Sequence, residues 1–195
     1  MSTSGVRYHH GDLRAALVAA ALPLLREVGP AGLSLRAVAR AAGVSAMAPY
    51  RHFRDKDALL AAVATHGFAL FATRLEGALA AAAGARAALI EQGVAYVTFA
   101  CTERALFRLM FGPLIAGAKA RDTLHQGGAP AYAALERAVA AMVADPARRP
   151  AVTLSCWSVA HGLACLLVDG QVAMPAETEA IAVLARSVLD QAVPR

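Results

Sequence analysis

Apolar residues recur along this chain at helical spacing, and no segment alternates apolar and polar residues as a half-buried strand does. In the first such run, the larger apolar residues Leu13, Leu17, Leu24 and Val28 return to one side of a helix. Alanine, the strongest helix former, dominates a composition that is 58% hydrophobic but only 6% aromatic. The pattern therefore predicts an all-α protein.

Helix-ending and helix-capping residues divide the N-terminal part into four helices. The first is expected at about 12–28, with a kink at Pro23 and an end at the Gly-Pro pair that follows. The predicted N-caps of the second, third and fourth helices are Ser34, Ser45 and Asp55. Gly43 allows a tight turn between the second and third helices, so a helix-turn-helix is expected at about 34–53.

The rest of the chain is expected to form a helical bundle. The fourth helix continues to about residue 79, and the predicted helices after it lie at about 86–102, 105–111, 118–144 (interrupted or ended near Gly127-Gly128), 149–169 and 176–192. This organisation predicts an N-terminal helix-turn-helix domain at 11–71 and a helical-bundle domain at 72–195.

One stretch has the composition of a membrane span, because 150–168 contains no charged residue. It contains Thr153, Ser155, Ser158 and His161, however, so a buried bundle helix is the better interpretation. No membrane partner is expected.

The expected third helix has two chemically different faces. Advancing about 100° per residue places Pro49 and Phe53 on its inward side. The outward face and its rims carry Met47, Ala48, Tyr50, Arg51 and His52. Small and apolar groups let a helix approach base edges, and an arginine can bond guanine or phosphate. Lys56, in the first turn of the fourth helix, adds a cation beside free backbone N–H groups, which favours a phosphate.

The charge distribution points to the same end of the molecule. The first 60 residues hold eight Arg and Lys against four Asp and Glu, so this third of the chain carries four of the five net positive charges. Such an asymmetry is typical of a protein that binds a polyanion such as DNA.

The stretch LSLRAVARAAGVSAMAPYRHFRDKDALL resembles the helix-turn-helix of the TetR family of transcriptional regulators in its A-G-V-S turn, its Y-x-H-F and its K-x-x-L-L. The resemblance implies that Tyr50, His52 and Lys56 hold phosphates. It also implies that Ala46, Met47 and Arg51 face bases, that Arg36 reaches the DNA and that Phe53 is core. The candidate DNA-binding residues are Arg36, Ser45, Ala46, Met47, Ala48, Tyr50, Arg51, His52 and Lys56. The family usually has leucine or valine where Pro49 stands.

The last two helices are expected to form a homodimer interface, because they are apolar on several faces and such helices must be buried. Pairing with a second copy would make a four-helix interface and set two recognition helices roughly 34–36 Å apart. Family members pair the DNA-binding head with a divergent domain that dimerises and binds a small effector. The opening YHHGDLRAAL and the later Trp-x3-His-Gly both resemble one branch of the family.

The bundle domain also contains candidates for a ligand pocket. They are Phe99, Phe107, Met110, Phe111, Trp157, His161 and Cys165. A stripe of aromatic residues at helical spacing is more often core than pocket, and His161 is more simply a hydrogen-bonded interior histidine than a switch. A metal site at His161 and Cys165 would need a second pair of ligands, and none is in evidence. No metal or cofactor is expected.

Two other classes of function remain as alternatives. An enzyme would need a nucleophile with its base, paired carboxylates or a phosphate loop, and only His161 beside Cys156 or Cys165 offers a candidate. A helical interaction module would leave the cationic head without a purpose. The three cysteines have no framework spacing and the N-terminus lacks the apolar core of a signal peptide, which favours the cytoplasm. We expect a cytoplasmic, ligand-responsive regulator that binds operator DNA, more specifically a repressor released by a small apolar or amphipathic molecule.

Overall fold

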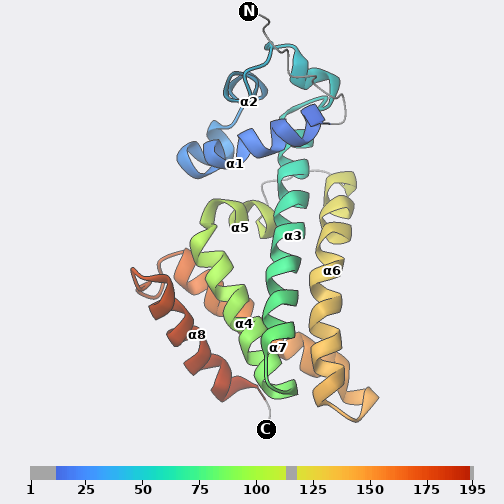
Figure 1. Cartoon of the computed structure of the whole chain (residues 1–195), viewed down its shortest axis with the longest axis vertical. Coiled ribbons are helices and arrows are strands. Elements are labelled where there is room, and N and C mark those ends of the chain that lie inside the picture. The colour runs from blue at the N-terminus through green and yellow to red at the C-terminus, as the bar shows by residue number, and fades with distance from the viewer. Residues whose placement is uncertain (1–11, 113–117, 194–195) are drawn as a thin grey trace, which may run out of the picture.

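The computed structural model describes residues 12–112 and 118–193, which form eight α-helices and two short 3-10 helices with no strand among them. The start of the predicted head at residue 11 and the end of the predicted bundle at residue 195 lie outside the described residues. In Figure 1 a head lies across one end of a longer helical body.

The head consists of three helical segments packed on the beginning of a long helix. The segments are α1 (Asp12–Gly32), α2 (Leu35–Ala41) and the 3-10 helix η1 (Ala48–Arg51), and the long helix is α3 (Lys56–Ala81). The head is held together by side chains that are almost completely buried, including Leu17, Leu25, Val38 and Phe53. Helix α3 continues from the head into the body and connects the two parts (Figure 1).

The body packs the second half of α3 with the remaining helices. These are α4 (Ala85–Thr102), α5 (Arg104–Phe111), α6 (Ala118–Met142), the 3-10 helix η2 (Pro146–Arg148), α7 (Arg149–Val168) and α8 (Thr178–Ala192). In Figure 1, α6 runs beside α3, and α4 lies between α3 and α8. Leu13–Gly32, Lys56–Ala81 and Pro146–Val168 are long and apolar enough to cross a membrane by length and composition alone.

Two predicted N-caps are confirmed. The hydroxyl of Ser34 accepts a hydrogen bond from the backbone N–H of Ala37 at 3.2 Å, and the carboxylate of Asp55 accepts one from Ala58 at 2.8 Å. Each bond satisfies a backbone donor that the first turn of a helix leaves free. These caps fix where α2 and α3 begin.

The predicted third α-helix, with Ser45 as its cap, is wrong. The chain turns at 46–47 and forms only η1, which has Met47 at its N-cap and no side-chain cap bond. Pro49 explains the difference, because it has no N–H to donate to the carbonyl of Ser45. That carbonyl instead accepts from Ala48 at 2.9 Å, in the tighter pattern of a 3-10 turn.

Two other predictions about helix breaks are also wrong. Within α1 the non-helical residue is Gly29, with φ 68° and ψ 177°, so the predicted end of the first helix at the Gly29-Pro30 pair is confirmed, whereas the backbone at Pro23, where a kink was expected, stays helical. A positive φ is easily adopted only by glycine. Helix α6 passes through Gly127 and Gly128 without interruption, and both glycines face the ring of Phe68 on α3.

Candidate DNA-binding surface and ligand cavity

The short η1 segment presents two faces, as the sequence predicts, although it is not an α-helix. Pro49 and Phe53 are buried, whereas the side chains of Met47 and Tyr50 are 69% and 43% exposed. The guanidinium of Arg14 on α1 lies over the ring of Phe53, 5.3 Å from the ring centre. A buried proline and phenylalanine therefore anchor the segment and leave Met47, Tyr50 and Arg51 outside.

The other candidate DNA-binding residues differ in exposure. Arg36, Ser45, Ala46 and Arg51 are exposed, while Ala48, His52 and Lys56 are half-buried. The ammonium of Lys56 donates a hydrogen bond to the backbone carbonyl of Ala31 at 2.6 Å. Lys56 thus ties the start of α3 to the end of α1, a structural contact that the sequence did not indicate.

The cationic charge of the head is compensated less than that of the body. In the body, arginines form ion pairs with carboxylates at 2.7–3.2 Å: Arg86 with Asp190, Arg108 with Asp169, Arg137 with Glu76 and Arg186 with Glu91. Within the described part of the chain, Arg36, Arg40 and Arg51 of the head form no such pair. These three exposed arginines therefore lie together at the end that carries η1, where they favour an anionic partner.

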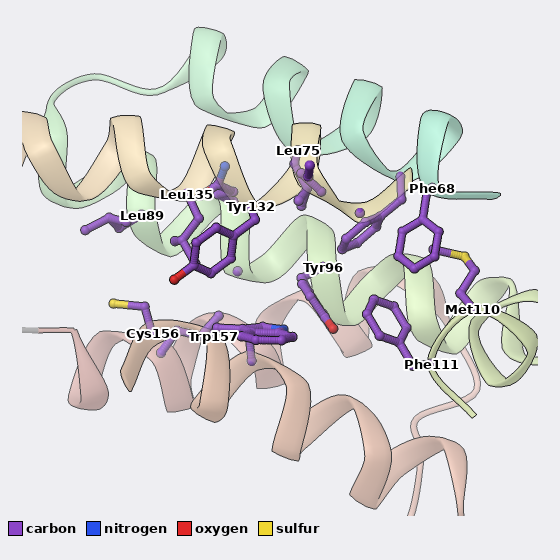
Figure 2. Close-up of a pocket in the computed structure, with 18 of the residues that line it drawn as sticks. Phe68, Leu75, Leu89, Tyr96, Met110, Phe111, Tyr132, Leu135, Cys156 and Trp157 are labelled. Carbon is purple, nitrogen blue, oxygen red and sulfur yellow. The ribbon is translucent and has the colours of Figure 1, made fainter. Parts of the chain in front are cut away.

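A cavity of about 620 Å³ lies inside the body. Its walls come from α3, α4, α5, α6, α7 and α8 and are mostly apolar. Figure 2 shows Phe68, Met110 and Phe111 at one end of this cavity, Leu89 and Cys156 at the other, and Tyr132 and Trp157 between them. The rings of Tyr132 and Trp157 meet edge to face, with centres 5.9 Å apart. A concave, aromatic-walled space of this size is typical of a small-molecule site.

The structure brings only part of the predicted pocket together. Met110, Phe111 and Trp157 line the cavity, but Phe99, Phe107, His161 and Cys165 do not. Phe99 and Phe107 are buried in the core, where Phe99 packs against Phe71 and Phe107 against Phe111. These four assignments to the pocket are therefore corrected. Helical spacing places a residue on the inward side but does not tell whether a cavity or another side chain faces it.

His161 is a hydrogen-bonded interior histidine. The hydroxyl of Tyr96 and Nδ1 of His161 share a hydrogen bond of 2.7 Å, and Nε2 of His161 lies 3.5 Å from Sγ of Cys165. Burial raises the pKa of Tyr96 and lowers the pKa of His161, so both groups are neutral near pH 7. The bond joins α4 to α7 beside the cavity. No group of three His, Cys, Asp or Glu that could hold a metal occurs among the described side chains.

Sequence reasoning missed the cavity-facing side of α4. Leu89, Gln92, Gly93 and Tyr96 all line the cavity, and their spacing of three and four residues is that of one helical face. The glutamine on this otherwise apolar helix face was the feature of the sequence that could have indicated a cavity there. Tyr132 of α6 gave no comparable signal, because its helix is rich in alanine and glycine.

Taken together, these features define a helix-turn-helix protein whose second domain is an all-helical bundle. The model of the tetR family of bacterial regulatory proteins matches residues 17–63, and the tetracyclin repressor-like C-terminal domain matches residues 89–189. The chain belongs to the TetR family of DNA-binding transcriptional regulators, a family of regulators and not of enzymes.

Solved structures agree with this assignment. A protein of unknown function from Rhodococcus is 33% identical, with a TM-score of 0.75, over 97% of this chain and 100% of that chain. A TetR/AcrR-family transcriptional regulator from Thermobifida fusca is 16% identical, with a TM-score of 0.72, over 94% and 100% of the two chains. The regulator FadR from Bacillus subtilis, solved with stearoyl-CoA, is 14% identical, with a TM-score of 0.72, over 92% and 97%. No curated protein matches the sequence.

Proposed function

We propose that the protein is a cytoplasmic repressor that leaves its operator when a small apolar or amphipathic molecule occupies the cavity. The observation that carries the proposal is the path of α3. Its first residues belong to the cationic head, and its later residues Phe68, Phe71 and Leu75 line the cavity. A ligand that favours one placement of α3 would change the placement of the head, and operator affinity would change with it.

In this proposal the head binds double-stranded DNA through η1 and its surroundings. Met47, Ala46 and Arg51 face the bases, while Tyr50, His52 and Lys56 contact phosphates. The exposure of Met47, Tyr50 and Arg51 and the cationic surface around them support this assignment. The hydrogen bond from Lys56 to the carbonyl of Ala31 sets the position of the ammonium between the start of α3 and the end of α1.

Homodimerisation through α7 and α8 is part of the same proposal. Three large aliphatic side chains on these helices are exposed, namely Leu154, Leu166 and Val183. Burying them against a second copy would remove apolar surface from water. Two-fold symmetry would then offer two heads to successive turns of DNA, roughly 34–36 Å apart.

The proposed effector is apolar or amphipathic because the cavity wall is mostly apolar. The structural likeness to FadR, a regulator solved with stearoyl-CoA, supports a ligand of this general kind in the same fold. The cavity is formed by the body alone, so ligand and DNA would bind at separate sites.

DNA binding is tested by titrating the protein against labelled promoter DNA beside its own gene at several salt concentrations. Tyr50→Ala and Arg51→Ala should each weaken binding about tenfold, and Arg51→Ala, which removes a cation from the DNA surface, should also reduce the slope of log affinity against log salt by about one. Arg148→Ala is the matched control, because Arg148 is an exposed cation in η2, at the end of α6 far from the head (Figure 1). Equal affinity and slope in all variants would show that the assigned surface is wrong.

A further inference from the structure

Helix α7 ends in a glycine-capped turn. Gly170, with φ 73°, turns the chain so that the backbone N–H groups of the turn bond back to the carbonyls of Leu166 and Leu167. In a helix end of this kind the chain's own N–H groups are directed to carbonyls one and two residues before the last helical residue. These bonds leave the carbonyl of that last residue, Val168, to side chains.

Two arginines of α5 bind this carbonyl. Arg104 donates to it at 2.8 Å and Arg108 at 2.7 Å. Arg108 also donates to the carboxylate of Asp169, the C-cap of α7, at 2.9 and 3.3 Å. Cations are favoured at the C-terminal end of a helix, where the macrodipole concentrates negative charge. We call this group the α5–α7 clasp: Arg104, Arg108, the Val168 carbonyl and Asp169.

The beginning of α5 is attached to the head. Glu103, the residue before α5, forms an ion pair of 2.9 Å with Arg26 of α1, and its side chain is only 12% exposed. Helix α1 also packs against α5, and Figure 1 shows α5 between α1 and the rest of the body. A single short helix is therefore bound to the head at its start and to the end of α7 along its length.

The clasp lies beside the proposed dimer surface. Leu166, in the last turn of α7, is 45% exposed and is one of the side chains through which α7 would contact a second copy. Helix α3 alone would let the head bend and rotate about the helix axis. The second attachment, from α7 through α5 to α1, restricts this movement. It fixes the head relative to the helix that would form the dimer.

We propose that the α5–α7 clasp sets the separation of the two heads in the dimer, and thereby the half-site spacing that the protein accepts in its operator. This inference rests on the proposed function, since it requires a homodimer that binds DNA. Arg104 and Arg108 are positioning residues, which act through α5 and do not touch the DNA. With the clasp intact, a wrong spacing forces strain on the heads or deformation of the DNA. Without it, the heads reach other spacings with less strain.

The experiment compares two operators. Nuclease footprinting first locates the stretch that the protein protects in the promoter DNA beside its own gene. A second fragment carries one extra base pair at the centre of this stretch, which separates the half-sites by about 3.4 Å and rotates them by about 34°. The wild-type protein should bind the native fragment at least about tenfold more tightly than the fragment with the insertion.

Two variants break the clasp with opposite changes of charge. Arg108→Met keeps the apolar stem and removes a cation, and it should lower the ratio of the two affinities to about threefold. Asp169→Asn removes an anion from the same contact and should lower the ratio as well. An effect of net charge on DNA binding would have opposite signs in these variants and would cancel in the ratio. Asp169→Asn also keeps the test valid if Arg108→Met fails to fold.

Arg137→Met is the matched control. Arg137 pairs with Glu76 at 3.2 Å between α6 and α3, outside the clasp, and its side chain is 57% exposed against 50% for Arg108. This variant should keep the wild-type ratio.

The outcomes separate this inference from the proposed function. A wild-type ratio near one, wild-type ratios in both clasp variants, or an equal fall in Arg137→Met would overturn the inference and leave DNA binding intact. If the wild-type protein does not bind the promoter DNA at all, the proposed function itself is refuted.

Discussion

The guanidinium of Arg26 on α1 donates three hydrogen bonds to the carboxylate of Glu103, at 2.9–3.1 Å. Glu103 lies at the junction of α4 and α5, so this bond joins the head to the body. Helix α5 also carries Met110 and Phe111 of the cavity wall. A displacement of α5 by a ligand would therefore reach α1 directly, in addition to the path along α3.

Glu103→Gln should weaken the coupling between cavity and head. The neutral amide cannot reproduce the paired, charge-assisted bonds, so a ligand that displaces α5 would move α1 less. We expect the ratio of operator affinities without and with a saturating cavity ligand to fall about fivefold, with ligand affinity unchanged.

The control is Glu91→Gln, which breaks the bidentate contact with Arg186 inside the body and does not touch the head. Both variants are measured by the anisotropy of labelled DNA. An equal effect of the two variants would show that Arg26 and Glu103 contribute only to stability.

The stability of the protein should fall as the pH is lowered from 7.5 to 5. Burial lowers the pKa of His161, so near pH 6.5 the unfolded chain binds a proton that the folded chain does not. The unfolded state is favoured progressively as pH falls toward the folded pKa. Urea unfolding should show a shallower pH dependence for His161→Gln than for the wild type. Identical slopes would mean that His161 is not held neutral by the fold.

The contact between α3 and α5 should tolerate no added volume. A Cβ at Gly67 would lie 2.7 Å from Sδ of Met110 and 2.9 Å from Cδ1 of Leu106, so Gly67→Ala should destabilise the fold by about 1–3 kcal/mol. Gly77 on the same helix has nothing within 4 Å of an added Cβ, and Gly77→Ala should stabilise by about 0.5–1 kcal/mol through helix propensity. Urea unfolding of the two variants tests this, and shifts in the same direction would contradict it.

Pro49→Leu should retain operator binding within about threefold, because the buried position admits an aliphatic side chain and the outer face of η1 is unchanged. Anisotropy with promoter DNA measures affinity, and circular dichroism checks the fold. A loss of either would mean that the proline itself shapes the recognition segment.

The N-terminal fold was readable from sequence because its signals are local. Ser34 and Asp55 each cap within three residues, and Pro49 in the 3-10 helix and Phe53 just after it are buried, as the helical pattern predicts. The sequence pattern did not predict that the segment is a 3-10 helix. That difference comes from a single hydrogen bond, the one to the carbonyl of Ser45 that Pro49 cannot donate. The cavity was only partly predicted, since Gln92 and Tyr132 line it from helices that are distant in sequence. Periodicity gives the inward side of each helix but not the shape of the space between helices.

The most direct test of the central claim records two signals in one titration. A complex of the protein with labelled promoter DNA is titrated with a small apolar compound that quenches Trp157, the only tryptophan of the chain, while Trp157 fluorescence and DNA anisotropy are followed together. If cavity occupancy releases the operator, quenching and loss of anisotropy will share one midpoint. Complete quenching of Trp157 with the DNA still fully bound would contradict the account.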